Sequence, residues 1–207
     1  MQEEELKNRL SRAWAKFNNH KEILVNDRLP IGLGLKLFSA TVTPTLLYGS
    51  GTWALTQQMC GKLRAQQRKM LRCIAKCHKH FPKDPHTVDE YVNWIKNATT
   101  KTNQLMDQFD VRDWVDEQRC RKWTWAGTVA RRQDSRWTHE VLKWDPPDLK
   151  IRGRPKTRWS DEINEYLTAV NGCQQAGKDW TMAALDKKKW STLLKGFVEY
   201  SKAKPRS

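Results

Sequence analysis

Basic side chains recur in segment 58–79 at spacings that a helix would place along one stripe. The members of the stripe are Lys62, Lys69, Arg72, Lys76 and Lys79, while Arg64 and Arg68 fall on an adjacent face. The segment contains no Asp or Glu that could pair with them along the same helix. A helix of this kind can neutralise successive phosphates, because each contact releases a counterion. The spacing therefore predicts a nucleic-acid-binding helix, and the alternative is an ordinary solvated face.

A second basic segment, KIRGRPKTRWSDEI, precedes an acidic helix start. Its candidate nucleic-acid contacts are Arg152, Arg154, Lys156, Arg158 and the aromatic Trp159. Three interpretations remain open: a loop that contacts phosphates, a solvated linker, or a DNA hook. The string RGRPK resembles the core of an AT-hook, and the narrow minor groove of A·T-rich DNA favours an inserted Arg.

Eleven tryptophans must be accommodated in 207 residues. Trp114, Trp123, Trp125 and Trp137 could stack on unpaired bases, but such residues more often form the core between helices. We predict a core role for most of these four. The better candidates for stacking are Trp53 and Trp159, which lie beside glycine-rich or basic stretches.

Metal binding and catalysis receive little support. Cys73, Cys77 and His86 have part of the spacing of a zinc site, but Glu90 and Tyr91 stand where a fourth Cys or His would be needed. Buried cysteines on an apolar helix face are the preferred interpretation. No P-loop, nucleophile elbow, HExxH motif or pair of adjacent aspartates occurs. We therefore predict no cofactor, no metal site and no enzymatic activity of the chain by itself.

The overall charge indicates the class of partner. The net charge is +15, and between Asp27 and Asp84 the sequence contains ten Lys and Arg but no acidic residue. Such a charge attracts polyanions, so nucleic acid is the first candidate partner. No hydrophobic run is long enough to cross a membrane, and the first residues lack the pattern of a signal peptide. An intracellular protein is expected, in a nuclear or cytoplasmic ribonucleoprotein, not a secreted one.

Helical periodicity recurs along the chain, and no long stretch alternates with a period of two. Helices are predicted at 3–20, 31–48, 58–79, 87–107, 112–131, 136–143 and 161–171, with a last helix capped by Asp186. Pro44 is expected to kink or restart the second of them. The predicted fold is all-α. It consists of two small helical domains, 1–80 and 87–207, joined by a Pro-containing linker at 81–86 and carrying basic loops.

Several strings together resemble the region after the polymerase palm of LINE-type (non-LTR) retrotransposon reverse transcriptases. They are LKNRLSRAWAKFNN, KLFSATVTPTLLYGSGTWALT, LRAQQRKMLRCI, RKWTWAGTVARR, RW at 136–137, RGRPKTRWSDEI and KKKWSTLLKGFVEY, in this order. The resemblance runs from about residue 5 to about residue 200. It implies a thumb-like domain over 1–80, followed by a Trp-rich tail that contains the RGRPKTRW segment.

The sequence departs from the family pattern at two positions. Gly51 stands where the family usually has Glu, and Thr128 stands where it often has His. The aspartates of the polymerase active site, which lie upstream in the family, are missing. The resemblance therefore implies a nucleic-acid-binding C-terminal fragment that holds template RNA and primer, or target DNA, and that acts with the rest of a reverse transcriptase polyprotein. The alternatives are a stand-alone DNA-binding protein with an AT-hook-like segment, or a non-functional remnant.

Overall fold

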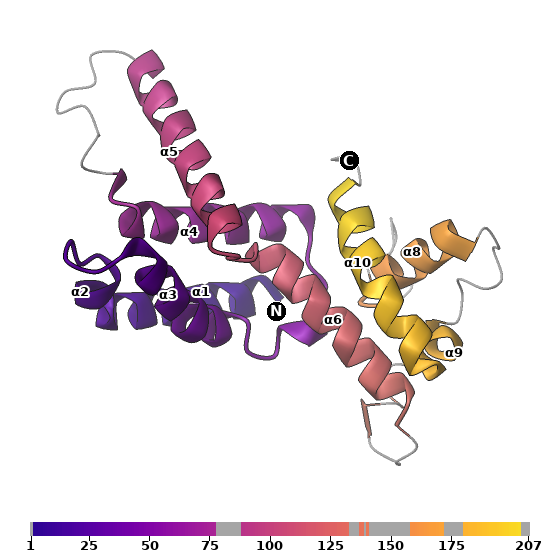
Figure 1. The fold of residues 1–207 in the computed structure, drawn as a ribbon. Coiled ribbons are helices and arrows are strands. Elements are labelled where there is room, and N and C mark those ends of the chain that lie inside the picture. Colours follow the sequence, from indigo (N-terminus) through magenta and orange to yellow (C-terminus); the bar gives the residue numbers. More distant parts are fainter. Residues whose placement is uncertain are drawn as a thin grey trace. The chain divides into compact units, whose positions relative to one another are not determined.

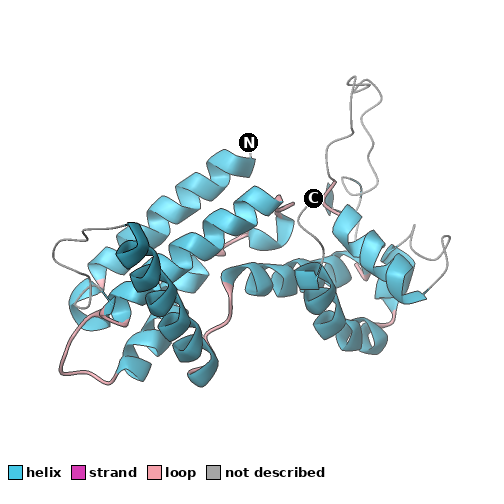
Figure 2. Cartoon of the chain, turned by 90° about the horizontal axis from the view of Figure 1, so that it is seen from above, coloured by secondary structure: helices cyan, strands magenta, loops and turns pink. Residues whose placement is uncertain are grey.

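The computed structural model describes residues 2–77, 88–132, 137, 138, 140, 158–171 and 180–203 (Figure 1). Within these residues the regular elements are all helices, and no strand is present (Figure 2). The predicted all-α fold class is confirmed. The helices divide between two compact units.

The first unit comprises Met1–Tyr48 and Leu55–Glu117. Its helices are α1 (Gln2–Asn19), α2 (Lys21–Leu24), α3 (Ile31–Leu46), α4 (Gln57–Ile74), α5 (Val88–Gln108) and the first residues of α6 (Trp114–Ala130). Helix α3 runs through Pro44 and ends two residues later, so the chain does not restart there. The bounds of the predicted helices in this unit agree with the structure to within a few residues, except at the end of α4.

The core of the first unit forms where aromatic side chains of three helices meet. Phe17 of α1 packs edge-on against Phe38 of α3, and Phe38 stacks on Trp114 with ring centroids 5.7 Å apart. All three side chains are buried. The indole N–H of Trp114 donates to Thr43 Oγ1 at 2.9 Å, so the polar atom of this buried ring is satisfied. The predicted core role of Trp114 is confirmed.

A buried glutamine fixes the start of α6 within this unit. Gln67 Nε2 of α4 donates to the Arg112 carbonyl at 2.8 Å, and Gln67 Oε1 accepts the backbone N–H of Trp114 at 2.9 Å. Asp113 Oδ1 accepts the N–H of Val115, which satisfies one of the unpaired donors at the start of the helix. Helix α4 therefore positions the segment that leads into α6.

Helix α5 belongs to the first unit, whereas the sequence analysis placed it after the linker. Ala98 of α5 packs with Ala75 and Cys77, just beyond the end of α4. The indole N–H of Trp94 also donates to the Cys77 carbonyl at 3.2 Å. The predicted linker at 81–86 lies outside the described residues. Because α5 packs against the elements before it, residues 81–86 connect two parts of the same unit.

The second unit comprises Gly49–Ala54 and Gln118–Ser207. It contains the short 3-10 turn η1 (Ser50–Thr52), the remainder of α6, α8 (Asp161–Asn171), α9 (Trp180–Leu185) and α10 (Lys187–Ala203). The predicted helix at 136–143 lies mostly outside the described residues. The glycine-broken turn joins this unit because Gln118 Nε2 donates to the Ser50 carbonyl at 3.0 Å. Gly49 adopts φ 71°, a left-handed conformation that favours glycine.

Two tryptophans hold α6 against α10 in the core of the second unit. The rings of Trp123 and Trp190 stack with centroids 3.9 Å apart. Each indole N–H donates to the backbone carbonyl of the other residue, at 2.9 and 3.0 Å. Phe197 and Tyr166 pack against Trp123 and complete the aromatic cluster. The predicted core role of Trp123 is confirmed.

Three charged side chains are packed together inside the second unit. Lys122 Nζ lies 2.9 Å from Glu162 Oε2, and Arg119 Nε lies 3.2 Å from Glu162 Oε1. Lys122 is 2% exposed and Arg119 is 6% exposed, and Arg119 also donates to the Ser201 carbonyl. Burial by itself acts to raise the pKa of Glu162, but Lys122 and Arg119 outweigh it, so the pKa lies below its ordinary value. The Glu162 carboxylate therefore contacts both buried cations.

Two glycines inside helices permit close approach of a neighbouring ring. A Cβ at Gly127 of α6 would lie 2.5 Å from Trp190 Nε1, and a Cβ at Gly196 of α10 would overlap Tyr166 Oη. Both ring atoms are held by hydrogen bonds and cannot shift freely. We expect Gly127→Ala and Gly196→Ala each to lower the free energy of unfolding by about 1–3 kcal/mol, measured by urea denaturation.

The control for these substitutions is Gly61 of α4, which is exposed and has no atom within 4 Å of an added Cβ. Gly61→Ala should raise the free energy of unfolding by about 0.5–1 kcal/mol, because alanine loses less conformational entropy in a helix. Stabilisation by all three substitutions would show that α6 and α10 do not pack as described.

Candidate nucleic-acid interface

The predicted basic stripe on α4 is divided between two sides of the helix. On the side of α1, Lys62 Nζ lies 4.0 Å from Glu3 Oε1, and Lys69 Nζ lies 5.5 Å from the Trp14 ring centroid. Arg72 belongs instead to the row of Arg64 and Arg68, which are spaced four residues apart. Four residues are close to one helical turn, so these three side chains share one face.

The row of arginines lies on the side of α5. Arg64 Nε pairs with Asp113 at 3.3 Å, and Arg68 Nε donates to Asn103 Oδ1 of α5 at 3.4 Å. The acidic residue that pairs with Arg64 lies outside α4. The unpaired positive charge of α4 is therefore smaller than the sequence of this helix alone indicates.

Two further members of the predicted stripe do not continue it. Helix α4 ends at Ile74, and Lys76 adopts φ 56°, which turns the chain away from the helix. Lys76 Nζ lies 2.5 Å from the Asp27 carboxylate and 3.2 Å from the Asn26 carbonyl. The prediction that Lys76 extends a helical row of cations was wrong, because this lysine anchors the loop before α3. Lys79 lies outside the described residues.

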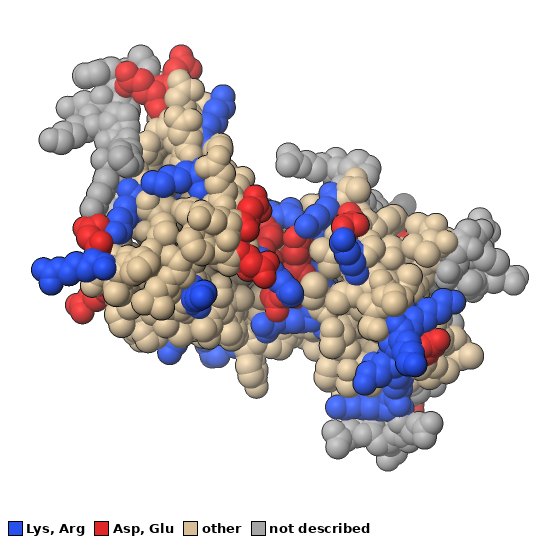
Figure 3. All heavy atoms as spheres, in the orientation of Figure 1, with Lys and Arg blue, Asp and Glu red and all other residues tan. Residues whose placement is uncertain are grey.

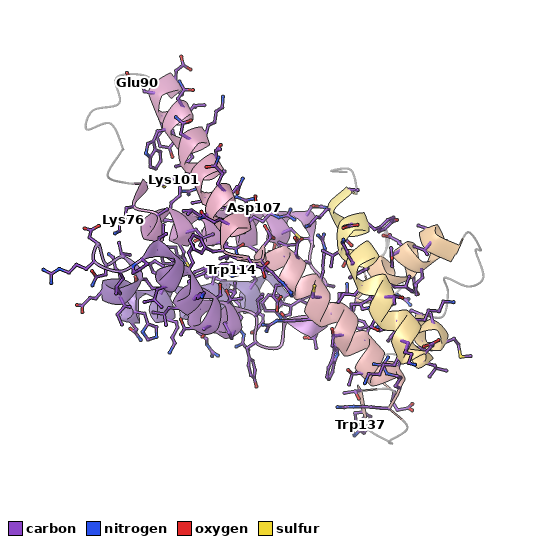
Figure 4. All side chains as sticks on the ribbon, in the orientation of Figure 1. Lys76, Glu90, Lys101, Asp107, Trp114 and Trp137 are labelled. Carbon is purple, nitrogen blue, oxygen red and sulfur yellow. The ribbon has the colours of Figure 1, made fainter. Side chains whose placement is uncertain are left out.

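A lysine of α5 joins the arginine row near the end of α4. Burial raises the pKa of the Cys77 thiol, while the charges of Lys101 and Arg72 act in the opposite direction. Figure 4 shows Lys101 on α5, and it lies two residues before Asn103, the α5 residue that Arg68 contacts. We call Arg68, Arg72 and Lys101 the α4–α5 basic face. Figure 3 shows basic side chains over this part of the first unit.

The cysteines of the weak zinc pattern lie beside this face. Cys73 is half-buried and Cys77 is buried among apolar side chains, whereas His86 lies outside the described residues. Within the part of the chain that the structure describes, no cluster of three or more His, Cys, Asp or Glu could hold a metal ion. Over the same part, no helix is long and apolar enough to span a bilayer.

The two tryptophans chosen as stacking candidates have packing roles instead. Trp53 is buried. The indole N–H of Trp159 donates to the Gly51 carbonyl at 2.8 Å, and its ring packs edge-on against Trp180. Lys122 Nζ lies 5.8 Å from the same ring. Trp159 is thus a part of the second unit's packing.

Two further tryptophans of the Trp-rich region, Trp125 and Trp137, differ in their exposure to solvent. Trp125 is half-buried, with the Arg132 guanidinium 5.8 Å from its ring centroid. Trp137 is 82% exposed, so it does not fulfil the core role that was predicted for most of the four tryptophans. Its neighbours in the sequence include few apolar residues, and periodicity alone could not reveal whether another helix covers it.

The structure describes the basic segment that precedes α8 only from Arg158 onward. Arg152, Arg154 and Lys156 lie outside the described residues. Arg158 is exposed, and its backbone N–H donates to Asp161 Oδ2 at 2.6 Å. Asp161 thus closes a turn at the start of α8, and its negative charge complements the positive end of that helix. Arg152, Arg154, Lys156 and Arg158 remain predicted nucleic-acid contacts.

A basic surface that the sequence analysis did not select lies in the second unit. The exposed Lys187, Lys188 and Lys189 form the first turn of α10, and Arg131 and Arg132 follow the end of α6. Arg131 Nη1 donates to the Ala184 carbonyl at 2.7 Å, which brings the two groups together. A sequence signal was present: three consecutive lysines occupy a helix start, where positive charge is unfavourable.

Comparison with known proteins gives one informative similarity. Over 196 residues the chain is 29% identical to a Caenorhabditis elegans protein with the provisional description of an uncharacterized transposon-derived protein. The alignment covers 92% of this chain and 64% of that protein, so the chain spans just under two thirds of its relative's length. No protein-family model and no solved structure matches. The similarity supports a transposon origin for this chain.

Proposed function

We propose that this chain binds RNA or DNA through the phosphate backbone, and that it corresponds to the thumb and tail region of a LINE-type reverse transcriptase. The proposal is supported by the ordered strings that resemble this region and by the similarity to a transposon-derived protein. In this role the chain holds template RNA with its primer, or target DNA, beside a polymerase core.

The observation that carries the binding proposal is the α4–α5 basic face. Arg68, Arg72 and Lys101 come from two packed helices, and none of them has an acidic partner within 4 Å among the described residues. Cations without acidic partners are available to phosphate oxygens, and arginine can engage two of those oxygens at once. The contact of Arg68 with Asn103 adds a side-chain amide, which can also donate to phosphate.

The proposed role is binding without catalysis. Nucleotidyl transfer by polymerases requires carboxylates that hold two metal ions, and the sequence contains no pair of adjacent aspartates. The polymerase activity of such an element would reside in a part of the parent protein other than the one described here. The chain's contribution is to position the nucleic acid.

The experiment compares two triple variants that remove the same charge from the first unit. We expect Arg68→Gln/Arg72→Gln/Lys101→Gln to weaken binding of a labelled 20-nucleotide RNA hairpin by about 100- to 500-fold in 0.1 M salt. Each lost phosphate contact should cost roughly five- to eightfold through counterion release. The control, Lys7→Gln/Lys21→Gln/Lys36→Gln, changes exposed lysines of α1, α2 and α3. Fluorescence anisotropy gives both affinities, and equal losses would contradict a role for the α4–α5 basic face.

A further inference from the structure

Five cations of the second unit gather where α6 ends and α10 begins. We call Arg131, Arg132, Lys187, Lys188 and Lys189 the α6–α10 basic surface. The 2.7 Å hydrogen bond from Arg131 to the Ala184 carbonyl fixes the end of α6 beside α9, and α9 leads directly into Lys187. Figure 3 shows basic side chains gathered over this part of the second unit.

The positive charge of this surface comes from side chains and not from unpaired backbone groups. Asp186 Oδ1 accepts the backbone N–H groups of Lys188 and Lys189, each at 3.0 Å. Asp186 is therefore occupied as the cap of α10. Among the described residues, none of the five cations has an acidic side chain within 4 Å. Such a concentration of like charges is unfavourable unless a polyanion covers it.

An exposed aromatic ring follows the same helix end. Trp137 is 82% exposed and lies five residues after Arg132, so the two Cα atoms are at most about 18 Å apart. Figure 4 shows Trp137 beyond the end of α6. A large exposed indole is costly in a free protein, but it offers a flat face on which an unpaired base can stack. In a duplex the bases stack on each other and cannot use such a ring.

We propose that the α6–α10 basic surface, together with Trp137, is a binding site for single-stranded nucleic acid. The cations hold successive phosphates, and one unpaired base stacks on the Trp137 ring. This inference rests on the proposed function. It adds a second nucleic-acid contact, in the second unit, that prefers single strands. The α4–α5 basic face recognises phosphates of either a duplex or a single strand.

Trp137→Ala tests the stacking part in the full-length chain. For a labelled 15-nucleotide oligo(U), we expect the affinity to fall about 5- to 150-fold, the usual contribution of one stacked base. For a 15-base-pair duplex the affinity should change by less than about threefold. The control is Tyr48→Ala, which removes an exposed aromatic residue of the first unit and should leave both affinities unchanged. Equal effects of Trp137→Ala on oligo(U) and duplex, or no effect on either, would overturn the proposal.

Lys187→Gln/Lys188→Gln tests the phosphate part against a control on the same helix. In 0.1 M salt we expect affinity for oligo(U) to fall about 25-fold, because a single-strand contact contributes roughly fivefold. The control, Lys195→Gln/Lys202→Gln, removes the same charge further along α10 and should weaken binding by less than about threefold. Equal losses would overturn the site. If the variant of the α4–α5 basic face still lost affinity, the proposed function would stand while this inference failed.

Discussion

Replacing Glu162 by glutamine is expected to lower the free energy of unfolding by about 3–5 kcal/mol. The substitution keeps the shape of the side chain but removes the negative charge that contacts the buried Lys122 and Arg119. Urea denaturation followed by circular dichroism measures the loss. The control is Glu199→Gln on α10 of the same unit, an exposed position where a change within about 0.5 kcal/mol is expected. Equal stabilities of the two variants would show that the two cations are not buried as described.

The ion pairs of Glu162 should also make the free energy of unfolding decrease at acidic pH. Because the pKa of Glu162 is lowered in the folded protein, the unfolded chain binds a proton more readily than the folded chain. The stabilisation is therefore complete above the ordinary Glu pKa of about 4.3 and is lost as the pH falls through the folded value. Glu162→Gln lacks this pH-dependent stabilisation. The free energies of unfolding of the wild-type chain and of the variant should therefore approach each other as the pH falls.

Raising monovalent salt from 50 to 200 mM is expected to weaken nucleic-acid binding by about 10²- to 10⁴-fold. This range corresponds to a slope of log K against log salt on the order of −4 to −7, which five to eight phosphate contacts would produce. Fluorescence anisotropy titrations on A·T-rich DNA, G·C-rich DNA and an RNA hairpin measure the slope. Similar slopes on all three are expected, because phosphates carry no sequence information. A slope near zero would mean that the net charge of +15 serves another partner.

The helices could be predicted because their apolar residues repeat with a clear period. The periods of Leu6, Phe17 and Phe38 identified α1 and α3, and the structure buries all three side chains. The short helices α2 and α9 were not predicted, because four and six residues are too few to show a helical period. The all-α class therefore followed from sequence, but the list of elements was incomplete.

The candidate interface was only partly predictable, since charge pairing depends on neighbours that are distant in sequence. Arg64 is paired with Asp113 and Lys76 with Asp27, and neither acid belongs to α4. Tryptophan placement depends on tertiary packing in the same way. Trp159, a candidate for base stacking, packs within the second unit, whereas Trp137 is exposed. Sequence indicated which residue types could bind phosphate, and only the packing showed which of them are exposed.

The domain boundary was placed at two prolines, but the packing follows a different division. The indole of Trp94 and the side chain of Ala98 tie α5 to the end of α4, although prolines intervene in the chain. Conversely, the turn around Gly49 joins the second unit through hydrogen bonds to Gln118. Proline content marks places where helices stop, and it does not show which helices pack together afterwards.

The most direct test of phosphate recognition compares two strands with the same fifteen bases. One is an RNA oligonucleotide, and the other is a peptide nucleic acid, whose backbone has no charge. Competition against a labelled RNA hairpin in 0.1 M salt gives both affinities for the full-length chain. If phosphates supply most of the binding energy, the peptide nucleic acid should bind at least about a hundredfold more weakly. Affinities equal within about threefold would contradict the account, because binding would then depend on the bases and not on the backbone.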